Sequence, residues 1–359
     1  MTKDETYIYR CIELAKKGAG FVAPNPMVGA ILVYNDAIIG EGWHEQYGQP
    51  HAEINCINSV KQEHKQFISS STLYVSLEPC NHFGKTPPCC DRIILEQIKK
   101  VVVGCKDPFT EVNGAGIDKL KAAGVQVVVN VLKDACENLN QRFFIFHTKH
   151  RSYIILKWAQ TGDGKTAPLN LPQGETYKHL EIQRLLISNE YTNRLVHKWR
   201  SEEAAILVGT NTALMDDPQL TNRYWEGKQP LRLVIDKELK LPPHLKLFNS
   251  DARTIVFNLR KHTETGQPQY YQINKEQNVV EQIVTALYQL NIQSVLVEGG
   301  AKLLQSFIDA GLWDEARILT NEQLIIENGL YAPILSSHKI IREEKIATDR
   351  VTYYKNLQF

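Results

Sequence analysis

Long apolar stretches and net charge are both lacking in this sequence. No run approaches the ~18 apolar residues that suggest a transmembrane helix, and the first residues, MTKDETYIYR, lack the apolar centre of a secretory signal peptide. The formal net charge is only +1, which argues against a polynucleotide-binding protein, because such proteins need a basic groove. From these absences we expect a cytoplasmic protein that contacts neither a membrane nor a nucleic acid.

A disulfide framework and a dinucleotide fingerprint are missing as well. The seven cysteines are an odd number and include the adjacent pair Cys89-Cys90, which suits a reducing compartment better than a set of disulfides. A formal match to G-x-G-x-x-A at 18–23 follows a helical pattern rather than a strand and runs into Pro24. It therefore predicts the end of a helix and not a cofactor loop.

Length and composition are those of an ordinary globular protein with two domains. The chain has 359 residues, of which 43% are hydrophobic and 23% charged. A basic, polar junction follows the helical pattern that ends near residue 148. We therefore predict domains at 1–148 and 149–359.

The stretch from His51 to Cys90 concentrates the chemistry. It contains His51-Ala-Glu53, then Pro79-Cys80, then Cys89, and H-x-E followed by P-C and a further cysteine is the signature of zinc-dependent nucleobase deaminases. In that chemistry one histidine and two thiolates hold zinc and leave its fourth position to water. Glu53 would carry protons without binding the metal.

The spacing of these residues leaves alternatives open. Eight residues separate Cys80 from Cys89 instead of the usual two, so the segment NHFGKTPP is an insertion between the ligands. Cys90 competes with Cys89, which we favour because it directly follows Pro87-Pro88. A structural zinc with His82 as fourth ligand, or simply buried thiols, are the alternatives to a catalytic site. We place His51 and Glu53 about 200° apart on one helix, flanking a pocket.

The first half alternates strands and helices. MVGAILVY (27–34) and AIIGEGW (37–43) predict a hairpin that turns at Asn35-Asp36. Strands at 71–78, 101–108 and 125–132 then alternate with helices, and one helix extends from the region of residue 135 to the junction. This order indicates an α/β/α sandwich with a partly parallel sheet. Pro24 and Pro26 should hold Asn25 in an extended segment, where its amide suits the edge of a pyrimidinone.

The second half repeats the alternation. Lys157 and Ala159 share one face of a predicted strand, Ser188 is the expected N-cap of a helix, and residues 166–187 form a long, weakly patterned loop. Glu298-Gly299-Gly300 joins a strand to a helix, so bare N–H groups could hold a phosphate. A ligand-free turn is the alternative reading of that segment.

Three segments resemble one known family. APNPMVGAILV (23–33), GEGWHEQYGQPHAE (40–53) and LEPCNHFGKTPPC (77–89) are closely similar to the bifunctional deaminase/reductase of riboflavin biosynthesis. The resemblance covers nearly the whole chain. It implies an N-terminal cytidine-deaminase-like α/β/α sandwich and a C-terminal dihydrofolate-reductase-like α/β domain.

That resemblance also implies two reactions on a small-molecule pyrimidine ribosyl phosphate. The first is zinc-dependent hydrolytic deamination of 2,5-diamino-6-(5-phosphoribosylamino)pyrimidin-4(3H)-one, and the second is reduction of the ribosyl group to ribityl by NADPH. One Zn²⁺ per chain and NADPH are the expected cofactors. We also expect a homo-oligomer, either a dimer or a tetramer.

Site residues follow from the residue types and from the resemblance. Besides His51, Cys80 and Cys89 as metal ligands and Glu53 as the catalytic residue, we expect substrate contacts and NADPH contacts. The substrate contacts are Asn25, His44, His82, Lys85, Lys157, Leu220, Arg223 and Glu298. The NADPH contacts are Ala159, Thr212, Asp216, Gly300, Ala301, Lys302, Leu303, Leu304, Gln305 and Ser306. Ordinary structural roles compete with several of these assignments: a solvated Lys85 or Lys157, an Asx turn at Asn25 and a helix stop at Asp216.

The chain departs from the family pattern at three places. Gly162 replaces a leucine, which could loosen its turn; Phe109-Thr110-Glu111 replaces a Pro-Asn-Pro-like segment; and residues 166–187 replace a short Gly-Ser-Trp-like segment. Three alternative functions therefore stay open: a nucleic-acid or nucleoside deaminase with an appended binding domain, a zinc-stabilised binding protein without activity, and a deaminase with a degenerate reductase half.

Overall fold

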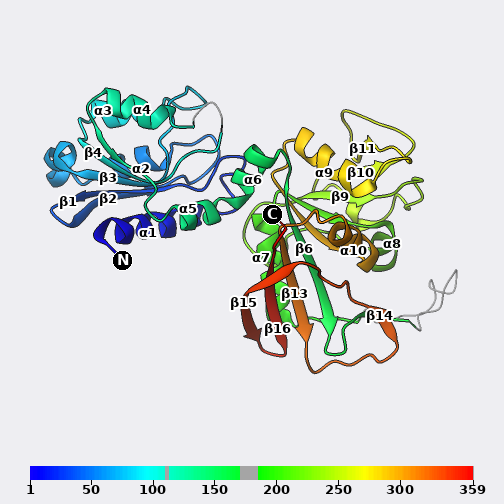
Figure 1. Cartoon of the computed structure of the whole chain (residues 1–359). Coiled ribbons are helices and arrows are strands. Elements are labelled where there is room, and N and C mark those ends of the chain that lie inside the picture. The colour runs from blue at the N-terminus through cyan, green and yellow to red at the C-terminus, as the bar shows by residue number, and fades with distance from the viewer. Residues whose placement is uncertain (110–112, 170–184, 359) are drawn as a thin grey trace. The chain divides into compact units, whose positions relative to one another are not determined.

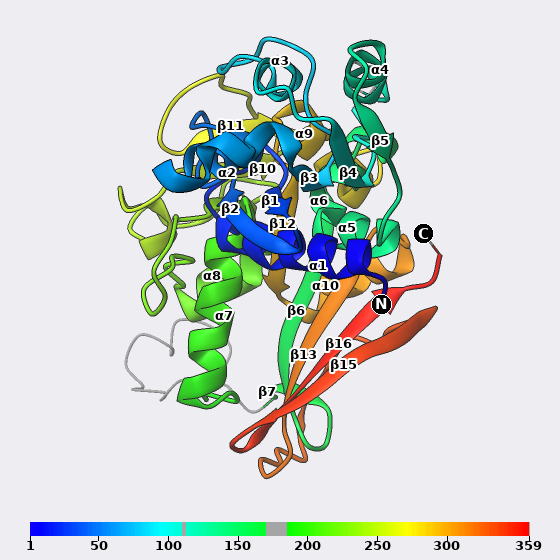
Figure 2. The same cartoon turned by 90° about the vertical axis from the view of Figure 1, so that its left-hand side faces the viewer.

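The computed structural model describes residues 1–109, 113–169 and 185–358 and divides the chain into two compact units (Figures 1 and 2). The first unit is Met1–Arg151 and the second is Ser152–Phe359, so the division falls a few residues after the predicted boundary. Most of the predicted loop at 166–187, together with Thr110 and Glu111, lies outside the described residues. No helix in the described ranges has both the length and the apolarity that crossing a membrane requires.

Among the described residues, a five-stranded sheet forms the centre of the first unit. The strand order is β2-β1-β3-β4-β5; β1 pairs antiparallel with β2 and β3, whereas β3, β4 and β5 run parallel. The partly parallel sheet predicted from the sequence is therefore confirmed. The strands are β1 (Gly29–Tyr34), β2 (Ala37–Trp43), β3 (Thr72–Leu77), β4 (Lys100–Cys105) and β5 (Gln126–Val128), and the helices are α1 (Lys3–Ala15), η1 (Lys16–Gly18), α2 (Ala52–Asn58), η2 (Gln62–Ser70), α3 (Cys89–Leu95), α4 (Ala115–Ala122), α5 (Lys133–Leu139) and α6 (Gln141–Lys149).

Helices cover both faces of this sheet because successive residues of each strand point to opposite sides. In β1, Ala30 and Leu32 join a core with α2, α3 and α4, whereas Ile31 and Val33 join a core with α1 and α5. Figure 1 shows α3 and α4 on one side of the sheet and α1 and α5 on the other. The first unit is thus the predicted α/β/α sandwich.

Two local predictions in the first unit have different outcomes. The hairpin turn at Asn35 and Asp36 is confirmed: both residues have positive φ, 46° and 62°, as a tight turn between twisted strands requires. The single helix predicted before the junction is wrong, because Asn140 separates α5 from α6. The side chain of Asn140 bonds to another segment, as described below.

The second unit contains a nine-stranded sheet with the order β11-β10-β9-β8-β12-β6-β13-β16-β15 in its described residues. The strands from β11 to β13 are parallel, and β16 and β15 add an antiparallel edge. Its elements are β6 (Tyr153–Thr161), α7 (Glu190–Glu202), β8 (Ala205–Val208), α8 (Thr210–Asp216), β9 (Leu231–Ile235), η4 (Lys246–Phe248), β10 (Thr254–Asn258), β11 (Gln269–Gln272), α9 (Val279–Gln289), β12 (Ser294–Gly299), α10 (Ala301–Asp309), β13 (Glu315–Asn321), β15 (His338–Ile346) and β16 (Asp349–Asn356).

The alternation of buried side chains again separates two cores. Leu207 of β8 packs with α9 and α10, whereas its neighbours Ile206 and Val208 pack with Ala213 of α8. The carboxyl ends of β8 and β12, which are adjacent parallel strands, lead directly into α8 and α10. Two helix N-termini therefore meet at one edge of the sheet.

Two further predictions need correction. Helix α7 is capped by Asn189, whose side chain accepts hydrogen bonds from the N–H groups of Tyr191 and Thr192, and not by Ser188. The first residues of the loop predicted at 166–187 belong to the strand β7 (Lys165–Pro168), which pairs with β14 (Gly329–Tyr331).

Candidate functional sites

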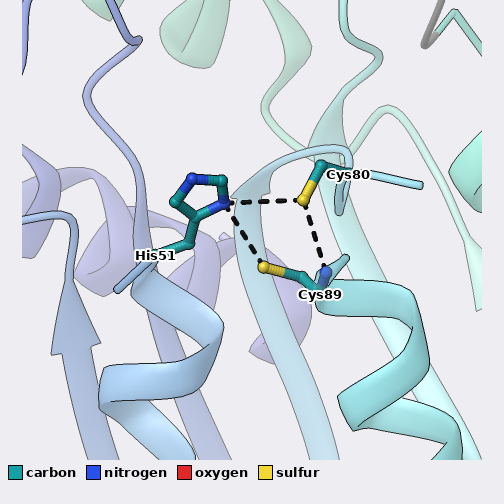
Figure 3. A group of neighbouring side chains, drawn as sticks. All are labelled: His51, Cys80 and Cys89. Carbon is teal, nitrogen blue, oxygen red and sulfur yellow. Dashed lines mark hydrogen bonds between the residues drawn. The ribbon is translucent and has the colours of Figure 1, made fainter. Parts of the chain in front are cut away.

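Three predicted metal ligands meet in the first unit (Figure 3). Nδ1 of His51 lies 3.5 Å from Sγ of Cys80 and 3.4 Å from Sγ of Cys89, and the three ligand atoms all lie within 4.8 Å of one another. One imidazole nitrogen and two sulfurs at this separation fit a single tetrahedral zinc and leave a position for a fourth ligand.

His51 precedes helix α2 instead of belonging to it. It is the N-cap, with φ −74° and ψ 168°, so the predicted separation of 200° on one helix does not apply to it. Helix α2 lies directly against β2 because Gly42 has no side chain: a Cβ there would lie 2.2 Å from the main-chain N of Cys56. Gly42 thereby brings the start of α2, with His51 and Glu53, against the sheet.

The two adjacent cysteines at the start of α3 face different surroundings. Cys89 turns to His51, and its N–H donates to Sγ of Cys80 at 3.3 Å. Cys90 points into the core, where its thiol donates to the carbonyls of Pro79 and Gly116. His82 is not among the grouped ligand atoms within the described ranges, which gives the four-ligand structural site no support.

Electrostatics in this cluster favour a thiolate beside a protonatable acid. Hydrogen bonds from the Cys89 side chain and then from His51 and the Cys89 N–H lower the pKa of Cys80 to about 4 despite burial. Glu53 is only 3% exposed, and burial, with Cys80 nearby, raises its pKa to about 7. A carboxyl group with a pKa near neutrality can both accept and release a proton.

Asn25 and His44 form one hydrogen-bonded pair next to this cluster. Nδ1 of His44 lies 3.1 Å from the carbonyl O of Pro50 and must donate to it, so Nε2 accepts from the Asn25 amide at 3.2 Å. The Oδ1 atom of Asn25 therefore has its lone pairs available for a donor. The His44 and His51 rings lie 5.2 Å apart. Asn25 is not in the predicted extended segment, because its N–H closes a turn onto the carbonyl of Val22.

Two buried side chains that the sequence did not indicate support these groups. Asn140, at the break between α5 and α6, exchanges two hydrogen bonds with the main chain of Met27, at 2.8 and 2.9 Å. Glu78, two residues before Cys80, accepts from the N–H groups of Asp107, Gly114, Gly116 and Ile117. Neither has a local sequence signal, because their partners lie far along the chain.

The inserted loop between the two cysteines carries His82 and Lys85 on the surface. Nζ of Lys85 lies 4.2 Å from the ring centre of Tyr47, which belongs to the loop that leads to His51. Both predicted anion-binding side chains are therefore accessible, although no hydrogen bond joins them to the ligand cluster in the described residues.

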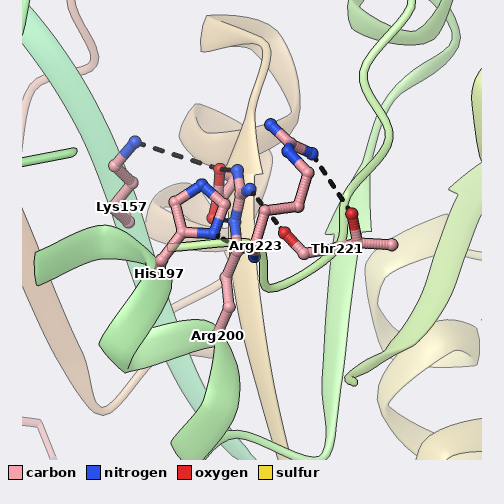
Figure 4. Close-up of polar contacts among 6 residues, drawn as sticks. Lys157, His197, Arg200, Thr221 and Arg223 are labelled. Atoms are coloured by element: carbon pink, nitrogen blue, oxygen red, sulfur yellow. Dashed lines mark hydrogen bonds and ion pairs between the residues drawn. The ribbon is translucent and has the colours of Figure 1, made fainter. Parts of the chain in front are cut away.

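A second polar cluster lies in the second unit (Figure 4). The guanidinium of Arg200 on α7 forms two hydrogen bonds of 2.7 Å with the carboxylate of Glu298, and Nζ of Lys157 lies 3.9 Å from the same carboxylate. Only 7% of the Glu298 side chain is exposed, but these cations outweigh the loss of solvent and lower its pKa to about 2. The carboxylate is thus ionised at neutral pH. Lys157 and Glu298 were predicted site residues, whereas Arg200 was not.

The segment that carries Leu220 and Arg223 lies beside this cluster. Nη1 of Arg200 donates to the carbonyl of Thr221 at 3.2 Å, and the N–H of Arg223 donates to Nδ1 of His197 at 2.9 Å. The Arg223 side chain is exposed, whereas Leu220 is only 2% exposed and packs in the core beneath α8. Of these two predicted contacts, only Arg223 has an exposed side chain.

The predicted cofactor residues lie on β6 and on α8 and α10, the helices that follow β8 and β12. Gly300 is the N-cap of α10, and a Cβ at Gly299 or Gly300 would lie within 3.3 Å of Oγ1 of Thr212, so two predicted residues, Thr212 and Gly300, meet there. Ala301, Lys302 and Leu303 form the first turn of α10. Further along the helix, Leu304 is buried in the core, Gln305 accepts from the N–H of Ile334, and Ser306 bonds to its own helix. Asp216 is exposed at the end of α8, and Ala159 is partly buried on β6.

The turn at Gly162 is firmly held, contrary to the expected loosening. A Cβ at Gly162 would lie 2.9 Å from the carbonyl O of Glu322. The absence of a side chain at Gly162 therefore allows the main chain of Glu322 to lie close to this turn. Asp163 accepts from the hydroxyl of Thr161 and from the N–H groups of Ile326 and Glu327.

Family comparisons match each unit separately. Residues 1–105 match the cytidine and deoxycytidylate deaminase zinc-binding region, and residues 152–324 match the RibD C-terminal domain. Curated proteins are similar along nearly the full length. The riboflavin biosynthesis protein RibD of Aquifex aeolicus is 36% identical and covers 98% of both chains, and that of Escherichia coli K12 is 31% identical over 90% of this chain and 89% of its own.

Solved structures agree with these matches. A diaminohydroxyphosphoribosylaminopyrimidine deaminase/5-amino-6-(5-phosphoribosylamino)uracil reductase of Thermotoga maritima is 35% identical, covers 99% of both chains and superposes with a TM-score of 0.86. RibD of Acinetobacter baumannii is 29% identical, covers 98% of both chains and has a TM-score of 0.85. The similarity extends through both units.

Proposed function

The chain belongs to the RibD family of bifunctional riboflavin-biosynthesis enzymes, with a deaminase and a reductase domain, and from this premise we propose the residues that perform each reaction. Its substrates would be those named for the Thermotoga relative: diaminohydroxyphosphoribosylaminopyrimidine for the deaminase and 5-amino-6-(5-phosphoribosylamino)uracil for the reductase. We assign the deaminase to the unit 1–151 and the reductase to the unit 152–359.

His51, Cys80 and Cys89 are the proposed zinc ligands. The observation that supports them is the grouping of one nitrogen and two sulfurs within 4.8 Å, with one of the sulfurs predisposed to be a thiolate. When bound, zinc makes hydroxide available near neutral pH by lowering the pKa of water.

Glu53 is the proposed proton carrier of the deaminase. It would take the proton of the attacking water and deliver protons to the ring nitrogen and to the departing amine. Its burial suits this role, because a carboxyl group held away from bulk water exchanges protons with the substrate rather than with solvent. The carbonyl oxygen Oδ1 of Asn25, oriented by His44, would accept a hydrogen bond from the pyrimidine edge. His82 and Lys85 would bind the phosphate.

Substitution of Glu53 tests the deaminase assignment. Glu53→Gln keeps the size of the side chain, so zinc should remain at one per chain while deamination falls by roughly 10²-fold or more. Glu63→Gln, at an exposed position on η2, is the matched control and should leave both unchanged. Deaminase turnover that survives in Glu53→Gln at wild-type zinc content would refute the role.

The reductase residues mainly hold and orient two ligands, because the nicotinamide cofactor supplies the hydride. We propose that NADPH is held by Ala159, Thr212, Asp216 and residues 300–306, with bare N–H groups at the start of α10 near its phosphates. Lys157, Arg223 and Glu298 would contact the substrate, and Leu220 would contribute through its main chain. A bidentate guanidinium makes Arg223 the proposed partner of the substrate phosphate.

A direct assay tests the reductase half and its cofactor. The purified chain should oxidise NADPH when it is given the deaminated intermediate, with a kcat/KM for NADH at least about tenfold lower. Arg223→Ala should raise KM for the intermediate without changing KM for NADPH. No NADPH oxidation by a protein that still deaminates would show a degenerate reductase.

Partners and compartment belong to the same proposal. A net charge of +1 supports an enzyme of small molecules rather than of polynucleotides, and reduced cysteines suit the cytoplasm. The edge strand β15 exposes Ile340 and Ile341, and an unpaired edge of this kind favours a homo-oligomer. Light scattering of the purified chain would give the number of copies.

A further inference from the structure

The main chain of Thr221-Asn222-Arg223 is held by three side chains. The carbonyl of Thr221 accepts from Arg200 at 3.2 Å, and the N–H of Arg223 donates to His197 at 2.9 Å. Between them, Gln229 bonds to both the N–H and the carbonyl of Asn222, at 2.7 and 2.8 Å. This short segment therefore has little freedom to move.

His197 and Arg200 reach the segment from the same side of α7. They are three residues apart, which places both on one face of a helix, and Figure 4 shows the two side chains extending from that helix toward Arg223. Arg200 also binds Glu298, so the segment and the carboxylate have a common anchor. His197 is 1% exposed and makes a T-shaped ring contact with Tyr224 at 4.7 Å.

The guanidinium of Arg223 is held only lightly by its own contacts. Nη1 donates to Oγ1 of Thr221 at 3.1 Å, and the group lies 5.6 Å from the ring of Tyr224. No carboxylate pairs with it among the described residues. Its direction is consequently set mainly by the main chain from which it extends, and that main chain is fixed at its N–H by His197.

We propose that His197 is a positioning residue of the reductase: by accepting the hydrogen bond of the Arg223 N–H, it aims the Arg223 guanidinium at the phosphate of the substrate. This inference rests on the proposed role of Arg223 as a phosphate ligand. His197 itself touches neither the phosphate nor the reacting carbon in this assignment.

The hydrogen bond also fixes the protonation of the ring. A main-chain N–H can only donate, so Nδ1 of His197 must carry a lone pair and the ring proton must be on Nε2. Burial, reinforced by the nearby Arg200 and Arg223, lowers the pKa of His197 to about 4. The neutral ring that the contact needs is therefore the form present at neutral pH.

Two substitutions separate this role from a general packing role. In His197→Asn the oxygen Oδ1 can take the place of Nδ1 as acceptor, whereas His197→Leu fills similar space and leaves the part-buried N–H of Arg223 without its acceptor. We expect His197→Leu to raise KM for the phosphorylated intermediate roughly tenfold and to change kcat by less than about twofold. His197→Asn should restore most of the affinity. KM for NADPH should not change.

A neighbouring core residue supplies the matched control. Val196 is 3% exposed on the same helix and has no hydrogen bond to the 221–223 segment. Val196→Ala should lower the melting temperature of the reductase unit while KM for the intermediate stays at the wild-type value. Deaminase activity, measured on the same preparations, reports whether the rest of the chain is folded.

A double-mutant cycle and a dephosphorylated substrate give the decisive outcomes. If His197 acts through Arg223, the double variant His197→Leu/Arg223→Ala binds the intermediate no more weakly than Arg223→Ala alone. With the intermediate that lacks the 5′-phosphate, wild type and His197→Leu should then have equal kcat/KM.

Failure of the phosphate contact at Arg223 and failure of the positioning role of His197 give different results. An unchanged KM in Arg223→Ala overturns the proposed phosphate contact itself. A raised KM in Arg223→Ala with wild-type KM in His197→Leu overturns only the positioning role. A fall in kcat at constant KM in His197→Leu would also overturn it, because that result assigns the ring to the chemical step.

Discussion

Replacing Glu78 by glutamine should destabilise the first unit and loosen the proposed metal ligand Cys80. The carboxylate is 4% exposed and each oxygen accepts two main-chain N–H groups: Oε2 those of Asp107 and Gly114, and Oε1 those of Gly116 and Ile117, at 3.0–3.3 Å. It thereby joins the end of β3 to the loop after β4 and to the start of α4.

Hydrogen-bond chemistry sets the size of the effect. Glutamine offers one acceptor oxygen, so two of the four N–H groups would face an NH₂ group that can only donate. A hydrogen bond to a charged group contributes roughly 1.5–3 kcal/mol, so two lost bonds amount to about 3–6 kcal/mol. For a unit of this size, that corresponds to a melting temperature lower by at least about 6 °C.

Calorimetry with a zinc titration would measure both effects. In Glu78→Gln we expect the first unit to melt at a lower temperature and to bind zinc more weakly, with NADPH oxidation by the second unit unchanged. Glu137→Gln is the control, since Glu137 is half-exposed and its side chain pairs, within the described ranges, only with Lys133 at i−4, at 3.6 Å, a contact worth about 0.5 kcal/mol at most. A Glu78→Gln transition within 2 °C of wild type, using ~2 °C as the effect of one weak bond, would refute the reasoning.

Three other substitutions have defined outcomes. The folded pKa of Glu298, about 2, lies below its ordinary value of 4.5. Its ion pairs therefore stabilise the second unit above about pH 4.5, and this stabilisation is lost as the pH falls toward 2. The difference in unfolding free energy between wild type and Glu298→Gln, measured by urea unfolding from pH 7 to 3, should shrink accordingly. Gly42→Ala should push α2 from β2, since the new Cβ would lie 2.2 Å from the main-chain N of Cys56, and should weaken zinc binding in a metal-content assay. Asn140→Ala removes both bonds to Met27 and should raise the deaminase KM severalfold, whereas Asn138→Ala, at an exposed position, should not.

The grouping of the proposed zinc ligands could be predicted from the sequence because their chemistry is local. His51 and Glu53 are two residues apart, and Cys80 and Cys89 end the segments on either side of one insertion, so residue type and order were enough to select them. Their supports were not predictable in the same way. Glu78 and Asn140 bond to main-chain groups up to 113 residues away, and a buried carboxylate or amide looks like any other in sequence until its partners are known.

The reductase site shows the same limit more strongly. Lys157 on a predicted strand, Arg223 after a turn and Glu298 at a strand end stand out as charged groups, but Arg200 and His197 lie inside a helix that also carries other charged residues. What distinguishes them is the segment they face, and the strand order that brings α7 beside residues 221–223 is a property of the whole sheet.

The position of the N-cap of α7, at Asn189, affects this site. A helix rotates by about 100° per residue, so the rotation of α7 about its axis decides whether His197 and Arg200 face the 221–223 segment. That rotation is set where the helix docks: Asn189 caps it and also donates from its amide to the carbonyl of Ile346, while its N–H donates to Asp349. A helix that began at Ser188 would lack this anchor to β15 and β16. The cap residue therefore helps to decide which side of α7 meets Arg223.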